Sequence, residues 1–269
     1  MQDGKKKNMK IKIIASKKYG SEYLKEQLLN AISKTSLEVV EDNYDLSIAI
    51  GGDGTFLHSV RENNFNPNIM YIGINNGKLG FLQNVKTNEL IPFVKELENK
   101  KYSIDEIKYE KIKVYTDESI FNFKALNEVV IRDEGLKTLR LDVMINEEII
   151  ENVVGDGVLI STPIGSTAYN MSIGGPIVYT DLSCLILTPV SPINNQIFNT
   201  IRNPIVFHNK TLTVIPVEKS NDLVIVIDGI VKNIKEVRKI EIELSEDTLK
   251  LMRLNNYKYD NIIKNKFSD

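Results

Sequence analysis

The chain has 269 residues, of which 42% are hydrophobic, and its formal net charge is −2. This composition is typical of a soluble enzyme, and the near-neutral charge without a sustained Lys/Arg block gives no reason to expect nucleic acid or an anionic membrane as a partner. No run approaches about 18 consecutive apolar residues and the charged start does not resemble a signal peptide, so we expect a cytoplasmic protein.

The first hundred residues alternate between apolar runs and helical periodicity. Strands are predicted at 11–15, 46–50 and 70–74, and helices near 21–33 and 87–99. Alternation of this kind is typical of parallel strands joined by helices. We therefore expect an α/β domain with a parallel sheet over residues 1–100.

A glycine-rich motif follows the second of these strands. The chain reads Gly51-Gly52-Asp53-Gly54-Thr55, and a helix is predicted to start at Thr55. Glycines allow a tight turn and a close approach to a ligand, and backbone N–H groups at a helix start attract anions. The motif predicts a phosphate site with one carboxylate, Asp53, beside it. The alternative is that Asp53 only caps the helix.

Two familiar phosphate motifs are absent. The segment 73–79 is one residue short of a P-loop and has Leu79 where Ser or Thr should hold magnesium. The segment 52–57 has Leu57 in place of the third glycine of a dinucleotide fingerprint. A dinucleotide is therefore not expected to bind as it does in a dehydrogenase.

From residue 101 onward the pattern is rich in β-strands. Strands are predicted at 112–115, 128–132, 139–145, 149–154, 158–161, 212–217, 223–227 and 240–244. Asn146-Glu147 and Asp228-Gly229 are predicted hairpin turns, since Asn and Gly tolerate positive φ. We expect a mostly β domain over residues 101–249.

A second motif lies inside this β-rich part. After a short apolar strand, residues 161–176 are crowded with glycine and hydroxyl side chains, which is typical of a ligand-lining loop. It offers the hydroxyls of Ser166 and Thr167, and an aromatic face at Tyr169 for a planar group. The single cysteine, Cys184, is predicted to be a small buried core residue.

The motifs, in this order and spacing, resemble the NAD kinase family. The likeness rests on residues 51–55, Asn127-Glu128 and residues 155–169, and it covers nearly the whole chain. Lipid kinases and phosphofructokinases share the first motif, whereas the long second motif is specific to NAD kinases. The resemblance implies transfer of the terminal phosphoryl group of ATP, or of polyphosphate, to the 2′-hydroxyl of the adenosine ribose of NAD. It also implies that the tail 250–269 completes the first domain.

The resemblance assigns roles to residues of both domains. It implies that Asp53 is the catalytic proton acceptor. The phosphate donor would be bound by Gly51, Gly52, Gly54 and Thr55. The residues implied for NAD are Asp53, Gly54, His58, Asn127, Glu128, Asp156, Ile164, Thr167, Ala168, Tyr169, Asn170, Met171, Ser172 and Ser191. No cluster has dedicated metal-ligand spacing, so Mg²⁺ or another divalent cation is expected to arrive with ATP.

Three alternatives stay open for single residues. Glu128 could be a solvated strand residue, Tyr169 a core aromatic, and His58 an exposed helix histidine without a phosphate contact. The loop 190–203 reads Ser191-Pro-Ile193 where many relatives have Pro-His. Resemblance to a subset of bacterial members implies that this loop reaches a neighbouring subunit in a homo-oligomer, a tetramer. A purely structural turn cluster is the alternative there.

Two other functions remain as alternatives to the kinase. A lipid kinase of the diacylglycerol or sphingosine type would share residues 51–55, but it would not need the loop at 161–169. A non-catalytic NAD sensor could use the same acceptor pocket, but it would have no use for Asp53 in a phosphate-type turn.

Overall fold

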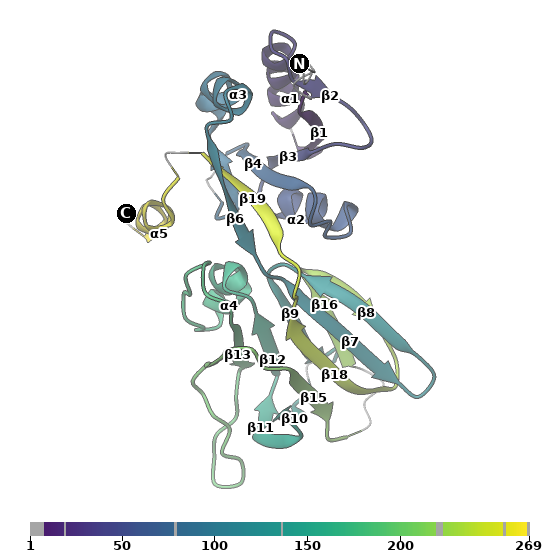
Figure 1. Ribbon diagram of the computed structural model, residues 1–269. Coiled ribbons are helices and arrows are strands. Elements are labelled where there is room, and N and C mark those ends of the chain that lie inside the picture. Colours follow the sequence, from purple (N-terminus) through teal and green to yellow (C-terminus); the bar gives the residue numbers. More distant parts are fainter. Residues whose placement is uncertain are drawn as a thin grey trace. The chain divides into compact units, whose positions relative to one another are not determined.

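The computed structural model describes residues 8–18, 20–77, 80–135, 137–218, 223–254 and 257–267 (Figure 1). Lys78 and Leu79, at the near miss to a P-loop, lie outside the described residues, as do parts of the tail. The chain divides into two compact units. The first unit is Met1–Ile107 with Leu249–Asp269, and the second unit is Lys108–Thr248.

The first unit is built on a mostly parallel sheet. Its strand order is β2-β1-β3-β4-β19-β6, with β5 beside β4, and only β6 runs antiparallel to its neighbour among the pairs described. The strands are β1 (Lys10–Ala15), β2 (Glu38–Val39), β3 (Leu46–Gly51), β4 (Met70–Asn75), β5 (Gln83–Val85), β6 (Tyr102–Ile107) and β19 (Leu249–Leu254). The helices are α1 (Ser21–Ile32), α2 (Asp53–Glu62), η1 (Thr87–Glu89), α3 (Leu90–Glu98) and α5 (Tyr259–Phe267).

Helices cover both faces of this sheet. Apolar residues of α1 and α3 share one core with Ile72 and Ile74 of β4. Tyr71 alternates with these isoleucines and therefore faces the other side, where Phe56 of α2 packs against it with ring centroids 6.5 Å apart. A strand buried on both faces needs a continuous apolar run, and β3 is buried along its whole length. The predicted strands and helices of this unit are confirmed, although α2 begins two residues earlier than expected.

The second unit is a sandwich of antiparallel sheets. Among the described residues the strand orders are β11-β10-β15-β18-β7-β8 and β14-β13-β12-β9-β16-β17. The strands of the first sheet are β7 (Glu110–Thr116), β8 (Ile120–Ala125), β10 (Leu139–Ile145), β11 (Glu148–Gly155), β15 (Leu212–Pro216) and β18 (Val237–Leu244). Those of the second are β9 (Glu128–Asp133), β12 (Gly157–Ser161), β13 (Leu185–Val190), β14 (Ile205–Phe207), β16 (Leu223–Ile227) and β17 (Ile230–Asn233).

One hydrophobic core joins the two sheets. It contains Ile112 and Val114 from the first sheet and Val129 and Ile131 from the second, all nearly inaccessible to solvent. The expected fold class, an α/β part with a parallel sheet followed by a mostly β part, is therefore confirmed. Both predicted hairpin turns are confirmed by positive φ angles, 51° and 69° at 146–147 and 46° and 77° at 228–229.

Several strands were not predicted from the sequence, because they contain charged residues or lie at the edge of a sheet. β6 is an edge strand with mostly exposed side chains, and β19 contains Arg253. Arg253 is only 2% exposed and is neutralised across the sheet, where its Nε lies 2.7 Å from Asp105 Oδ2. Cys184 is buried, as predicted. None of the described helices has both the length and the apolar character needed to span a membrane.

Candidate functional site

In the first unit, the predicted phosphate motif forms the turn between β3 and α2. Gly51 ends β3 with φ 155°, and a Cβ there would lie 2.3 Å from Thr55 Oγ1, so only glycine fits. Gly52 and Gly54 are exposed, and a Cβ on either would meet no atom within 4 Å. The first turn of α2 is thus open to a ligand, and its backbone N–H groups and helix dipole favour an anion.

The half-buried Asp53 carboxylate belongs to this turn but does not cap the helix. α2 has no side-chain cap, and Asp53 instead accepts backbone N–H groups from the loop after β4. Its Oδ1 lies 3.0 Å from the Leu82 amide nitrogen and its Oδ2 lies 3.2 Å from that of Phe81. The capping alternative is therefore wrong. Asp53 fastens the glycine turn to the loop 80–82 and keeps lone pairs for a further donor.

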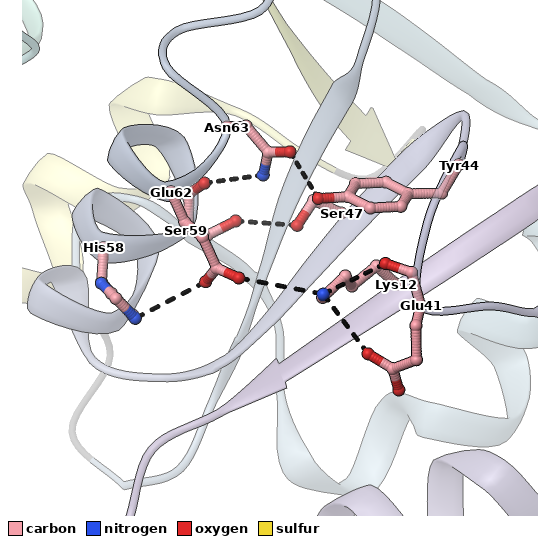
Figure 2. A network of polar contacts seen from close by, with 8 residues as sticks. All are labelled: Lys12, Glu41, Tyr44, Ser47, His58, Ser59, Glu62 and Asn63. Carbon is pink, nitrogen blue, oxygen red and sulfur yellow. Dashed lines mark hydrogen bonds and ion pairs between the residues drawn. The ribbon is translucent and has the colours of Figure 1, made fainter.

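His58 lies on the exposed face of α2, within a surface network of polar groups (Figure 2). Its Nε2 is 3.6 Å from Glu62 Oε2, and the other oxygen of Glu62 is 3.8 Å from Lys12 Nζ. Lys12 also lies 3.3 Å from Glu41 Oε2. The structure therefore places His58 beside a carboxylate of its own helix.

In the second unit, Asn127 and Glu128 lie at the start of β9 and are both 7% exposed. One oxygen of Glu128 has no hydrogen-bond partner among the described residues, and neither has Asn127 Oδ1. Burial raises the pKa of Glu128 to about 8, and the Asp228 charge adds to this, while a hydrogen bond from the Tyr169 amide opposes it. The alternative of a solvated Glu128 is wrong. This shift favours the neutral carboxyl, which can donate as well as accept.

Asp228 holds this strand start in place, a role that the sequence did not reveal. Its carboxylate accepts the backbone N–H groups of Leu126, Asn127 and Glu128, at 2.9, 2.8 and 3.3 Å. We predicted Asp228 only as a turn residue. The turn conformation is what directs its carboxylate at these amides, about a hundred positions away along the chain.

Glu110 is a second buried acid that sequence reasoning missed. It is fully buried, and a hydrogen bond from the Val129 backbone only partly offsets the cost of its burial. Burial, and then the charges of Asp228 and Glu128, raise its pKa well above the usual range. A signal existed, because Glu110 is two residues from Ile112 and four from Val114 on one strand, so all three side chains point to the same core.

The glycine- and serine-rich segment is held against Asn127. Thr162 Oγ1 donates to the Leu126 carbonyl at 2.6 Å. A Cβ on Gly165 would lie 2.0 Å from the Asn127 carbonyl oxygen, so the close approach requires glycine. Within this segment lie η2 (Ile164–Thr167) and α4 (Tyr169–Ser172). The glycine- and serine-rich segment is therefore packed directly against the start of β9 within the second unit.

Some polar side chains of this segment serve the loop itself. The Ser166 hydroxyl bonds to the backbone of Val178 and is fully buried, so our expectation that it faces a ligand was wrong. Asn170 is also fully buried, donates to the carbonyls of Ser166 and Pro176, and accepts from Thr188 Oγ1 at 2.7 Å. The side chain of Asn170 thus has its partners within the protein.

Other members of the segment are accessible. Tyr169 is 39% exposed, which rules out the core alternative. Ser172 is exposed, and Ala168 and Met171 are half-buried, whereas Ile164 and Thr167 are buried. The accessible side chains of the predicted NAD set here are therefore those at 168, 169, 171 and 172.

Asp156 and Ser191 lie together, away from Asn127 and Glu128. The Asp156 amide donates to the carbonyl of Val190, the residue before Ser191, at 3.0 Å. Asp156 and Ser191 are both exposed. In the register of β12, Gly157 pairs with Val190 while Ser161 pairs with Glu128. These pairs are at opposite ends of the strand, about 13 Å apart at the rise of a β-strand. The predicted NAD residues of this unit therefore form two groups.

The loop after Ser191 is tied down at its base and exposed at its tip. Thr200 Oγ1 accepts from the Val154 amide at 3.0 Å, and the Ile201 amide donates to Glu151 at 3.0 Å. On the other side of the loop the Ile193 amide donates to the Val154 carbonyl at 2.7 Å. Ile197, between Ile193 and Thr200 in the chain, is 81% exposed. Among the residues that the structure describes, no three His, Cys, Asp or Glu side chains are grouped to hold a metal ion.

Comparisons with known proteins agree with this arrangement. Residues 3–102 match the family model described as the ATP-NAD kinase N-terminal domain, and residues 126–254 match the ATP-NAD kinase C-terminal domain. NAD kinase 2 of Bacillus subtilis is 35% identical over 234 residues, covering 85% of this chain and 86% of that protein. The NAD kinase of Finegoldia magna is 32% identical over 234 residues, covering 84% and 85%.

Solved structures share the fold at low sequence identity. Yeast NADH kinase, solved in complex with NADH, has a TM-score of 0.84 at 17% identity, covering 97% of this chain and 88% of that one. An NAD kinase from Archaeoglobus fulgidus, solved in complex with ATP, has a TM-score of 0.74 at 22% identity, covering 96% and 98%.

Proposed function

This chain belongs to the NAD kinase family, and we propose that it transfers the terminal phosphoryl group of ATP to the 2′-hydroxyl of the adenosine ribose of NAD, giving NADP. It is an enzyme of the kinase type. The observation that carries the proposal is the placement of Asp53, a single carboxylate held by two backbone amides in an open glycine turn.

Asp53 is proposed as the proton acceptor of the reaction. Phosphoryl transfer depends mainly on positioning and on neutralising charge, and a carboxylate is a weak base early in such a reaction. With the amides of Phe81 and Leu82 bound to its two oxygens, Asp53 is fixed in orientation. It would orient the attacking hydroxyl and take up its proton late.

The donor phosphates are proposed to bind at Gly51, Gly52, Gly54 and Thr55. The first turn of α2 is open there, and its backbone N–H groups suit an anion. Magnesium, or another divalent cation, would be carried by the donor phosphates, because the described residues form no group of metal ligands of their own. Bound in this way, it would offset phosphate charge.

The adenosine part of NAD is proposed to bind at Asn127, Glu128 and the accessible residues of 168–172. Asn127 Oδ1 and one Glu128 oxygen are buried and have no hydrogen-bond partner in the described part of the chain, as expected of groups that a ligand would complete. An amide can pair with the adenine edge, and a carboxyl can bond a ribose hydroxyl. Tyr169 offers an exposed ring for stacking.

Asp156 is proposed to face the second nucleoside of NAD, and Ser191, in the loop 190–203, is proposed to reach the NAD site of a neighbouring subunit in a homotetramer. They lie at the opposite end of β12 from Glu128, beside a loop whose tip carries the exposed Ile197. Light scattering gives the oligomeric state. A change of Ile197→Asp should lower the mass if the loop tip lies in the interface, and a monomeric wild type would end this part of the proposal.

The proposal is tested with the purified protein, NAD and a choice of donors. ATP and inorganic polyphosphate are each supplied with and without Mg²⁺, and NADP is measured. We expect NADP with ATP and Mg²⁺ and none with EDTA. A lipid kinase would instead phosphorylate diacylglycerol, and an NAD sensor would bind NAD without consuming any donor. Enrichment of the protein in a cytoplasmic fraction would meet the expectation for its location.

A further inference from the structure

Two glycines make room for the side chain of Gln83, the first residue of β5. Gly73 of β4 is its partner in register, and a Cβ on Gly73 would lie 3.1 Å from Gln83 Cγ. A Cβ on Gly80 would lie 2.0 Å from Gln83 Oε1. A larger residue at 80 would require the Gln83 side chain to move, and one at 73 would also crowd the backbone of Leu82 and Gln83.

The amide of Gln83 is buried and makes no hydrogen bond to the residues that the structure describes. The residue is 1% exposed, and neither Oε1 nor Nε2 has a partner among the described residues. Buried amides are nearly always hydrogen-bonded, because an unpaired one destabilises the folded state. Methionine would fill the same space without this penalty, so packing alone does not explain glutamine here.

The polar neighbour of this amide is Asp53. The position that a Cβ would take on Gly80 lies 2.0 Å from Gln83 Oε1 and 2.3 Å from Asp53 Oδ1. The ends of the Gln83 and Asp53 side chains therefore approach each other at this position. A half-turn about the last side-chain torsion of Gln83 exchanges its oxygen for the N–H₂ group on the side of Asp53. Asp53 accepts amides from Phe81 and Leu82, and a carboxylate has room for another donor.

We propose that Gln83 is a positioning residue for phosphoryl transfer, whose amide donates a hydrogen bond to Asp53 and holds that carboxylate in line with the attacking hydroxyl. The inference rests on the proposed function. Because Gln83 is buried, it acts through Asp53 and does not touch the substrates. Three consecutive residues, Phe81, Leu82 and Gln83, would then each donate a hydrogen bond to the Asp53 carboxylate.

The test is the pair of variants Gln83→Met and Gln27→Met, assayed with NAD, ATP and Mg²⁺. Gln27 is exposed on α1 and controls for the substitution itself. For Gln83→Met we expect a thermal midpoint equal to or above that of the wild type. Its kcat should fall by about 10-fold or more, while KM for NAD and ATP changes less than about 2-fold. Gln27→Met should match the wild type.

A double-mutant cycle with Asp53→Asn separates action through Asp53 from an independent effect. If Gln83 acts through Asp53, the double variant is no slower than Asp53→Asn alone. A Gln83→Met protein that folds and turns over within about 2-fold of the wild type, or effects that multiply in the cycle, would overturn the inference. If methionine prevents folding, Gln83→Ala is judged by the same criteria. A wild type that forms no NADP would instead overturn the proposed function.

Discussion

The two units treat buried and half-buried acids in opposite ways. Asp53, in the first unit, receives two backbone N–H groups from one loop and faces an open turn. Glu110 and Glu128, in the second unit, are buried near Asp228, whose carboxylate accepts the backbone N–H groups of residues 126–128. The first environment fixes a charged carboxylate in place. The second raises the pKa of Glu110 and of Glu128 and so favours neutral carboxyls.

The largest effect is expected when the charge of Asp53, in the first unit, is removed. Asp53→Asn should lower kcat by about 10²-fold or more, because it removes the proposed acceptor of the hydroxyl proton. An amide has only one oxygen, so one of the Phe81 and Leu82 amides also loses its acceptor. NAD affinity, measured by calorimetry, should stay within a few-fold of the wild type. Near wild-type kcat at saturating substrates would contradict the role of Asp53.

The next effect is on the stability of the second unit. Asp228→Ala removes the acceptor of three backbone amides and should lower the free energy of unfolding by roughly 2–4 kcal/mol. NAD binding should weaken as well, since the start of β9 loses its support. Urea denaturation and calorimetry measure the two effects. Asp181→Ala, at an exposed position, is the matched control. Unchanged stability would show that Asp228 does not organise residues 126–128.

The dependence of stability on pH sharpens the comparison further. In the folded chain Glu128 has a pKa of about 8, whereas in the unfolded chain it ionises near 4.5, so the folded state holds an extra proton between these values. The free energy of unfolding therefore falls as pH rises through this window, by up to about 1.4 kcal/mol per pH unit. Glu128→Gln should remove this slope and gain stability over the wild type at pH 8.

Two comparison variants test the cause of that slope. Glu110→Gln should act in the same direction, because burial and neighbouring charge also raise the pKa of Glu110. Glu148→Gln, at an exposed position of β11, should leave the pH profile unchanged. A Glu128→Gln protein with the wild-type slope would mean that Glu128 is ionised in the folded chain at neutral pH.

The smallest effect is expected at His58. The exposed pair with Glu62 is of a kind that contributes little to stability, so His58→Ala should change the free energy of unfolding by less than about 0.5 kcal/mol. KM for ATP and NAD should change by no more than about 2-fold. An increase of KM for NAD by about 10-fold would instead place His58 in direct contact with the substrate.

The sequence predicted features formed by neighbouring residues and missed contacts between residues far apart in the chain. The turn at residues 51–55, the strand before it and the helix after it are local in the chain, so their spacing and apolar runs were sufficient to predict them. The acid cluster joins Glu110, Glu128 and Asp228, which no local pattern connects. Glu110 could have been placed in the core, because it shares a strand face with Ile112. Its proximity to Glu128 and Asp228 could not be predicted, because it depends on how the two sheets pack.

Roles within the glycine- and serine-rich loop were harder to predict for a different reason. Ser166 and Tyr169 are three residues apart, yet one is fully buried and the other is 39% exposed. A short 3-10 helix and a single helical turn reorient the side chains between them. Hydroxyl composition indicates a binding loop, whereas only the folded chain shows which hydroxyls hold the loop together.

The most direct measurement follows NADP with an NADP-specific dehydrogenase while the purified enzyme turns over NAD, ATP and Mg²⁺. That readout reports both transfer and phosphorylation at the 2′ position. We predict steady NADP formation by the wild type and its loss in Asp53→Asn. Binding of NAD by calorimetry without any NADP, from either ATP or polyphosphate, would contradict the account and indicate an NAD-binding protein without turnover.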